Sequence, residues 1–145
     1  MVEDPSLAAI EAAMVTVRRR QSRRALARAA GASGVDIAAQ EVLDAVAAAG
    51  GAAGVTGIAE ALDVDQPRAS KLVAAAVETG LLRREADQAD GRRSVLVLTG
   101  AGQERLDRMH AFRRARFAAA MADWTGTERA AFADLLTRFV AGLDT

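Results

Sequence analysis

The sequence predicts a mainly α-helical fold with one small β-hairpin, and three observations support this class. Alanine dominates an apolar fraction of 51%, whereas aromatic residues make up only 3%, a composition that suits closely packed helices. Apolar residues recur at helical spacing through much of the 145-residue chain. Two short apolar runs, LLRRE at 81–85 and SVLVL at 94–98, are separated by a polar stretch, which indicates a two-stranded hairpin with a long tip.

A first helix is predicted over residues 5–30. Pro5 suits a first turn, and apolar residues follow at helical spacing: Leu7, Ile10, Met14 and Val17. The second half carries arginines and no acid, at positions 18, 19, 20, 23, 24 and 28. Those at 18–24 can attract an anionic ligand, phosphate or acidic partner residues, or they can form a solvated, ion-paired helix face. The GASG stretch at 31–34 ends the helix.

A second helix is predicted over 36–49, with Asp36 as its cap. Its apolar contacts are expected from four residues: Ile37, Val42, Leu43 and Val46. The stretch AGGAAG ends this helix and is expected to form a loop.

Two shorter helices follow, joined by a tight turn. Thr56 can cap the first of them, whose inward residues are Ile58, Ala59 and Leu62. After the three residues DVD, the stretch QPRASKLVAAAVETG opens the second helix. Either Asp65 or Gln66 is its cap, Pro67 lies in its first turn and Gly80 ends it. Two helices joined by so short a turn form a helix-turn-helix.

Two longer helices are predicted after the hairpin. Thr99 caps the first, over about 100–123, and Thr125 with Glu128 forms a capping box for the last. The last helix has a regular apolar stripe: Phe132, Leu135, Leu136, Phe139, Val140 and Leu143. The whole order of elements is that of a winged helix-turn-helix with additional helices at both ends.

Composition excludes several kinds of site. Basic and acidic residues balance at 19 each, so nucleic-acid binding must rest on local charge. The absence of cysteine excludes disulfides and thiolate metal sites, and a single histidine, His110, gives no basis for a histidine metal site. No apolar stretch is long enough for a membrane span, and the N-terminus does not read as a signal peptide. We expect a cytoplasmic protein without a cofactor or a membrane partner.

The second helix of the helix-turn-helix has the chemistry to read DNA. On a helical wheel its apolar residues share one face: Ala69, Leu72, Val73, Ala76 and Val77. Lys71 lies opposite, with Arg68 and Ser70 on the flanks and Gln66 at the N-terminal end. Gln can bond adenine, and Arg and Lys can bond guanine, whereas Ser70 and Thr56 suit phosphates. The alternative for Arg68 and Lys71 is an ordinary solvated face.

The segment GIAEALDVDQPRASKLVAAAVETGLLRREADQADGRRSVLVLTGAGQERL resembles the multiple-antibiotic-resistance regulator (MarR) family of bacterial transcription factors. The family pattern is LA-x-x-L, a Ser followed by Arg or Lys, GL-hydrophobic-x-R, D-x-R and LT-x-x-G. This sequence supplies Ile58-Ala59 and Leu62, Ser70-Lys71, Gly80-Leu81-Leu82 with Arg84, Asp90-Gly91-Arg92, and Leu98-Thr99 with Gly102.

The resemblance implies a homodimer that binds a pseudo-palindromic DNA site and responds to a small anionic or aromatic effector. It implies one domain over 1–145, with a DNA-binding lobe at 36–99 and dimerisation helices at 5–30 and 100–145. Arg92 corresponds to the family's minor-groove contact, and Asp90 to the acid that holds the arginines in position. Because Gly91 replaces a frequent Arg, Arg93 can share the tip role.

The sequence favours a sequence-specific DNA-binding regulator, a ligand-responsive repressor, over two other readings. One alternative is a winged-helix module for protein–protein contact without DNA binding. An enzyme is disfavoured because the chain has one His, no Cys or Tyr and no phosphate-loop motif. His110 can line an effector cleft or be a packed, hydrogen-bonded residue. Four further residues fit a core or dimer stripe better than a cofactor box: Met109, Phe112, Met121 and Trp124.

Overall fold

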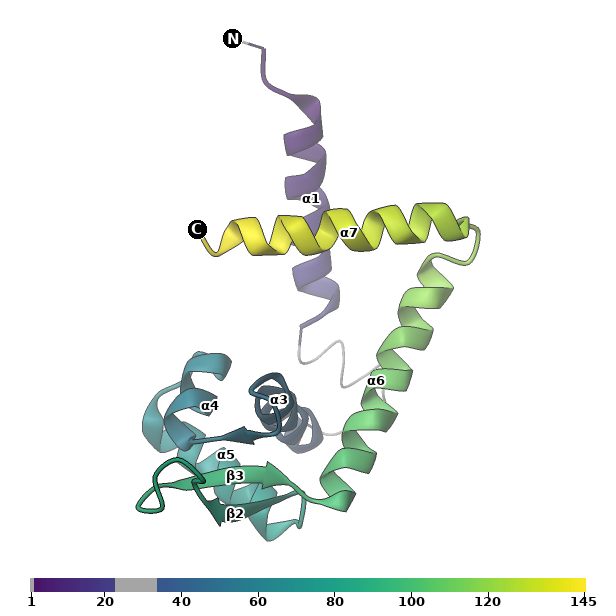
Figure 1. Cartoon of the computed structure of the whole chain (residues 1–145). Helices are drawn as coiled ribbons and strands as arrows, with labels where there is room; N and C mark the ends of the chain where they lie inside the picture. The colour runs from purple at the N-terminus through teal and green to yellow at the C-terminus, as the bar shows by residue number, and fades with distance from the viewer. Residues whose placement is uncertain (1, 23–33) are drawn as a thin grey trace. The chain divides into compact units, whose positions relative to one another are not determined.

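The computed structural model describes residues 2–22 and 34–145, which form six helices and a three-stranded antiparallel sheet (Figure 1). The mainly α-helical class with a β-hairpin is confirmed. The elements are α1 (Pro5–Arg20), α3 (Gly34–Ala48), β1 (Ala52–Ala53), α4 (Val55–Leu62), α5 (Gln66–Glu78), β2 (Leu82–Ala86), β3 (Ser94–Leu98), α6 (Gly100–Ala120) and α7 (Gly126–Leu143). The chain divides into two compact units, Met1–Met109 and His110–Thr145.

The first helix, α1, is shorter than the sequence predicted. Asp4 is its N-cap, accepting the Ser6 N–H at 2.9 Å, and Pro5 occupies the first turn as expected. Hydrogen bonds from the Ser6 hydroxyl and N–H lower the pKa of Asp4. The helix ends at Arg20, so its predicted continuation through 21–22 is wrong, and 23–30 lie outside the described residues. Arginines four positions apart repel one another across a helical turn, which weakens a continuation.

Helix α3 provides the centre of the core. Of its predicted apolar contacts, Val42, Leu43 and Val46 are fully buried and Ile37 nearly so. The predicted cap is wrong, because α3 begins at Gly34 and Asp36 lies inside the helix.

The sheet has one more strand than the predicted hairpin. Strands β2 and β3 pair antiparallel, Leu82 opposite Leu98, as the hairpin interpretation required. The short strand β1 pairs with the other edge of β3, giving the order β1-β3-β2. Residues 52–53 were predicted as loop, and two alanines carry no strand signal of their own. Their pairing depends on β3, which lies more than forty residues later in the chain.

One buried cluster joins the helices α3, α4 and α5 to the sheet and to the start of α6. Its central side chains are buried almost completely and come from α3, α4, α5, β2, β3 and α6: Leu43, Ile58, Val73, Leu82, Leu96 and Leu106. The buried polar residue Gln40 belongs to α3, and its Nε2 donates to Asp44 Oδ1 at 3.3 Å. Because α4 and α5 pack on this cluster, their outward faces have fixed directions within unit Met1–Met109.

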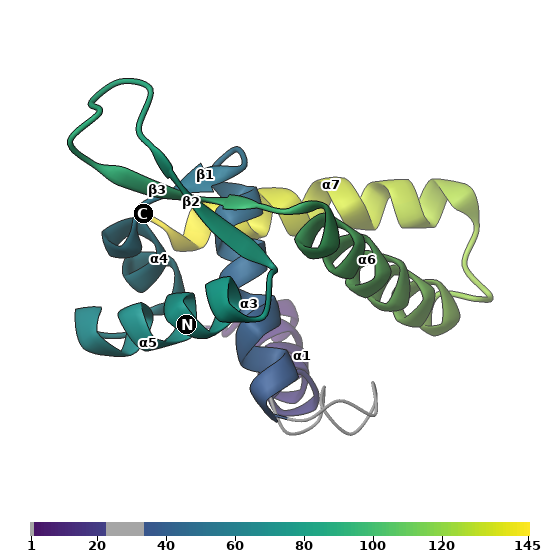
Figure 2. The same cartoon turned by 90° about the horizontal axis from the view of Figure 1, so that it is seen from below.

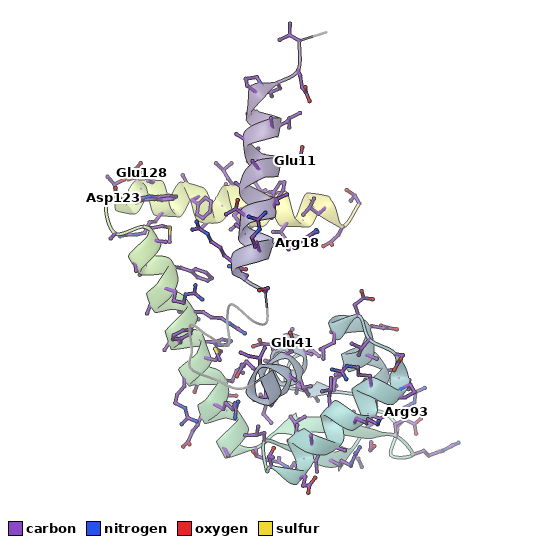
Figure 3. All side chains as sticks on the ribbon, turned by 180° about the vertical axis from the view of Figure 1, so that it is seen from behind. Glu11, Arg18, Glu41, Arg93, Asp123 and Glu128 are labelled. Atoms are coloured by element: carbon purple, nitrogen blue, oxygen red, sulfur yellow. The ribbon has the colours of Figure 1, made fainter. Side chains whose placement is uncertain are left out.

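Helices α6 and α7 have the caps that the sequence predicted. The Gly102 N–H donates to Thr99 Oγ1 at 3.0 Å at the start of α6. The Glu128 N–H donates to Thr125 Oγ1, and the Thr125 N–H returns a bond to Glu128 Oε1, which lowers the pKa of Glu128 at the start of α7 (Figure 3). Helix α6 ends at Ala120 rather than 123, because a turn over 121–124 leads into the Thr125 cap.

No helix within residues 2–22 and 34–145 combines the length and the apolar character that a membrane span requires.

The burial of Ile58 predicts a graded loss of stability on truncation. Ile58→Val should lower the free energy of unfolding by about 0.5–1.5 kcal/mol and Ile58→Ala by about 2–5 kcal/mol, because each removed methyl group leaves a larger cavity. Urea unfolding at one fixed protein concentration measures both values. Equal, small losses for the two variants would contradict the close packing described above.

Candidate nucleic-acid interface

The turn that joins α4 to α5 is shorter than the helices it connects and is stabilised by local backbone bonds. Asp63 adopts the left-handed conformation, with φ of 54°, and caps the end of α4. The Val64 N–H then donates to the Ala59 carbonyl at 3.0 Å. Asp tolerates this conformation better than most residues, so the first Asp of the DVD stretch is a local signal for the turn.

Helix α4 begins before the residue predicted as its cap. Gly54 is the N-cap, with extended backbone angles, so Thr56 is the second residue of the helix. The reason is tertiary: β1 ends at Ala53, and its pairing with β3 leaves a single residue between strand and helix. Glycine is an acceptable cap because it adopts this conformation readily. The Thr56 side chain is exposed near the start of α4.

Helix α5 begins at an aspartate cap and buries one face. Asp65 Oδ1 accepts the Arg68 N–H at 2.8 Å, which decides between the two predicted caps, and Pro67 lies in the first turn. The apolar face expected from the helical wheel is confirmed, with Ala69, Val73 and Ala76 buried and Leu72 and Val77 half-buried. Gly80, with φ of +78°, follows the helix as expected.

The opposite face of α5 carries the polar residues that the sequence singled out. Their side chains are all exposed: Gln66, Arg68, Ser70 and Lys71. Ala74 and Ala75 are exposed beyond them, so no bulky side chain covers the middle of this face. The face therefore presents amide, guanidinium, hydroxyl and ammonium groups on a slim helix, and the helix N-terminus adds a partial positive charge.

The wing loop, residues 87–93, projects beyond the helices of the same unit (Figure 2). Two backbone bonds close it, from the Asp87 N–H to the Arg93 carbonyl at 2.9 Å and from the Arg93 N–H to the Asp90 carbonyl at 3.0 Å. Asp90 Oδ1 accepts the Arg92 N–H at 3.1 Å. The acid thus orders the backbone on which Arg92 stands. Arg92 and Arg93 are both exposed, and Arg93 lies at the wing end of the lobe (Figure 3).

Arg83, on strand β2 beside the wing loop, forms an ion pair with Glu85. Arg83 and Glu85 are two residues apart on β2, so they share a face, and Arg83 Nη2 lies 2.7 Å from Glu85 Oε1. The Arg83 Nε also donates to the same oxygen at 2.8 Å. Spacing of two on a predicted strand was the available signal for this ion pair. Arg83 is therefore less available to a phosphate than the unpaired arginines of the wing tip.

The eight predicted site residues are all exposed and come from three elements of one unit. Thr56 lies on α4, and the wing loop carries Asp90, Arg92 and Arg93. Helix α5 carries the other four: Gln66, Arg68, Ser70 and Lys71. In the part of the chain that the structure describes, no group of three or more acidic or histidine side chains could hold a metal ion.

A family model of the MarR family matches residues 33–93, which include α3, β1, α4, α5, β2 and the wing loop. This segment of the chain is similar to the MarR family. The recognition stated from the sequence is confirmed, and the homologues with this winged helix are transcriptional regulators.

Solved structures agree with this assignment. A protein assigned as a transcriptional regulator in Pseudomonas aeruginosa is 28% identical, with a TM-score of 0.74 and 95% of each chain covered. A MarR-family transcriptional regulator from Silicibacter pomeroyi is 26% identical, with a TM-score of 0.62, 93% of this chain and 88% of that chain covered. A MarR-family protein from Bacillus stearothermophilus shares the fold, with a TM-score of 0.79 over 100% of both chains at 14% identity. The curated proteins include no significant sequence match.

The effect of the Asp65 cap on α5 can be tested separately from the effect of its charge. Asp65→Ala should lower the free energy of unfolding by about 1 kcal/mol, because the Arg68 N–H loses its acceptor. Asp65→Asn keeps a capping oxygen and should change stability by only a few tenths of a kcal/mol. Urea unfolding of both variants is the measurement, and an equal loss for Ala and Asn would rule out the cap as the cause.

Proposed function

We propose that this protein is a sequence-specific DNA-binding repressor of the MarR family that acts as a homodimer on a pseudo-palindromic operator. The observation that carries the proposal is the division of α5 into two faces. Its apolar side is buried in the lobe, and the exposed side presents Gln66, Arg68, Ser70 and Lys71 around two small alanines. A helix of this kind fits a major groove, which is wide enough for one α-helix.

The chemistry of α5 assigns a part to each exposed residue. Gln66 suits a bidentate contact with adenine, and Arg68 and Lys71 suit the O6 and N7 acceptors of guanine. Ser70, the first-turn N–H groups of α5 and Thr56 on α4 suit phosphate oxygens, which position the helix without reading sequence. Each good base contact discriminates by about 1–3 kcal/mol, so two or three are enough for a preferred half-site.

The wing loop supplies a second DNA contact from the same lobe. Arg92 and Arg93 stand on a loop whose backbone is held by Asp90, and within residues 2–22 and 34–145 neither side chain is paired with an acid. Narrow minor grooves have a strong negative potential that attracts arginine. We assign Arg92 to that groove, with Arg93 sharing the contact or binding the adjacent phosphate. This local placement supports DNA binding in spite of the zero net charge of the chain.

Two apolar stripes support the homodimer. On α1 more than a third of each side chain is exposed at Leu7, Ile10, Met14 and Val17, and on α7 the same is true of Phe132, Leu135, Leu136, Val140 and Leu143. Regular apolar stripes of this length are characteristic of helices that pack against another surface. We propose that α1 and residues 100–145 provide the dimer interface and that 36–99 form the DNA-binding lobe. A small anionic or aromatic effector stays a prediction from the family resemblance.

DNA binding is tested by gel shifts on the gene's own upstream region and on a genomic library. We expect a roughly 16–20 base-pair inverted repeat, because paired recognition helices reach half-sites about one helical turn apart. Arg92→Ala should weaken binding to most sequences and reduce the salt slope by about one. Arg68→Ala or Lys71→Ala should also relax the base preference. If the wild-type protein retained no DNA at low salt, the proposal would be wrong.

The dimer is tested by placing a charge on each side of α7. Leu136→Asp puts a carboxylate on the apolar stripe, whereas Ala130→Asp puts the same charge on the opposite side of the helix. Leu136→Asp should shift the protein to monomer in sedimentation and weaken operator binding by at least about tenfold, because a buried charge without a partner costs several kcal/mol. Ala130→Asp should remain dimeric. Two equally dimeric variants would exclude α7 from the interface.

A further inference from the structure

The hydroxyl of Thr99 connects the end of α5 to the start of α6. It donates to the carbonyl of Gly80, which follows the C-cap residue of α5, and it accepts the Gly102 N–H at 3.0 Å. The Thr99 N–H also donates to the carbonyl of Leu81 at 3.2 Å. Three bonds thus converge on one residue between β3 and α6. An ordinary N-cap needs only one of them, the bond from the helix N–H.

The first turn of α6 approaches this junction too closely for a side chain. A Cβ at Gly102 would lie 2.1 Å from the Leu81 carbonyl oxygen and 3.3 Å from the Leu98 side chain. Gly102 is buried, and one turn later Leu106 is 98% buried in the lobe core. The backbone of α6 therefore rests directly on the segment that ends α5, and all of these residues belong to unit Met1–Met109.

We propose that Thr99 and Gly102 are positioning residues that fix the angle between the recognition helix and α6, and so set the half-site spacing that the dimer recognises. The proposal rests on the proposed function, because it concerns how two lobes are held on one operator. Helix α6 runs without a break from Gly100 to Ala120, and the chain enters residues 110–145 through it. A stiff connection at its base restricts each α5 to few orientations, and a dimer restricted in this way matches one spacing best.

Four substitutions at Thr99 and Gly102 test whether Thr99 connects α5 to α6 or only caps α6. Thr99→Ser keeps both the donor and the acceptor. Thr99→Asp keeps an acceptor for the Gly102 N–H but cannot donate to the Gly80 carbonyl, so it retains the cap and removes the connection. Thr99→Val removes both bonds. Gly102→Ala forces the two segments apart and is the variant most at risk of unfolding.

The measurement is operator affinity as a function of half-site separation, with the two half-sites moved apart or together by one or two base pairs. Wild type and Thr99→Ser should share a sharp optimum. Thr99→Asp and Thr99→Val should lower the preference for the best spacing by about fivefold, the equivalent of one hydrogen bond of about 1 kcal/mol, while the base preference within each half-site stays unchanged. If Thr99 acts only as a helix cap, Thr99→Asp should instead have the same spacing preference as wild type.

Thr137→Val is the matched control, because the Thr137 hydroxyl donates only within its own helix, to the Ala133 carbonyl at 2.7 Å. It should keep the spacing optimum. Amide hydrogen exchange gives a readout that needs no DNA: Thr99→Val should speed exchange at Gly102, whose N–H loses its acceptor.

An unchanged spacing optimum in both Thr99→Asp and Thr99→Val would overturn the positioning role while leaving the proposed function intact. Failure of the wild-type protein to bind any DNA would overturn the proposed function and the spacing role with it. An unchanged exchange rate of the Gly102 N–H in Thr99→Val would refute the bond between Thr99 and Gly102, and with it the connection from Gly80 to Gly102. This conclusion would hold whatever the DNA-binding experiments show.

Discussion

The burial of one face of α5 is the contact on which the rest of the lobe depends. Ala69, Val73 and Ala76 leave almost no surface exposed, and Val73 and Ala76 belong to the buried cluster that also contains side chains of α3, α4 and the sheet. Small residues at two of these positions let the helix backbone lie close to the core. Because a helix has a fixed periodicity, burying this face also fixes the direction of Arg68 and Lys71 on the other.

Charge is organised locally on the same lobe. Glu85 pairs with Arg83, and the two acids of the wing loop accept backbone N–H groups, Asp87 from Ala89 and Asp90 from Arg92. These acids are therefore used in shaping the strand and the loop. The arginines of the loop and the basic residues of α5 remain exposed for a polyanion, which is why a chain with no net charge can present a basic surface.

Local signals predicted most elements well. The cap at Asp65, the end at Gly80, the Thr99 cap and the capping box at Thr125 all follow from hydrogen bonds between residues close in the chain. Two of the errors have different causes, a tertiary contact in one case and repulsion between nearby like charges in the other. Gly54, not Thr56, caps α4 because β1 pairs with β3, and α1 stops early within an arginine-rich stretch.

The sequence by itself determined which face of α5 is buried and which is exposed, because helical periodicity and capping depend on neighbours within a few positions. Its resemblance to the MarR family rests on the same local motifs. Only the tertiary structure decided that β1 exists and that Thr99 connects Gly80 to Gly102. The strand pairing and the bond from Thr99 to Gly80 join segments that are distant along the chain. These features therefore depend on the packing of the whole lobe, and a local sequence pattern does not predict them.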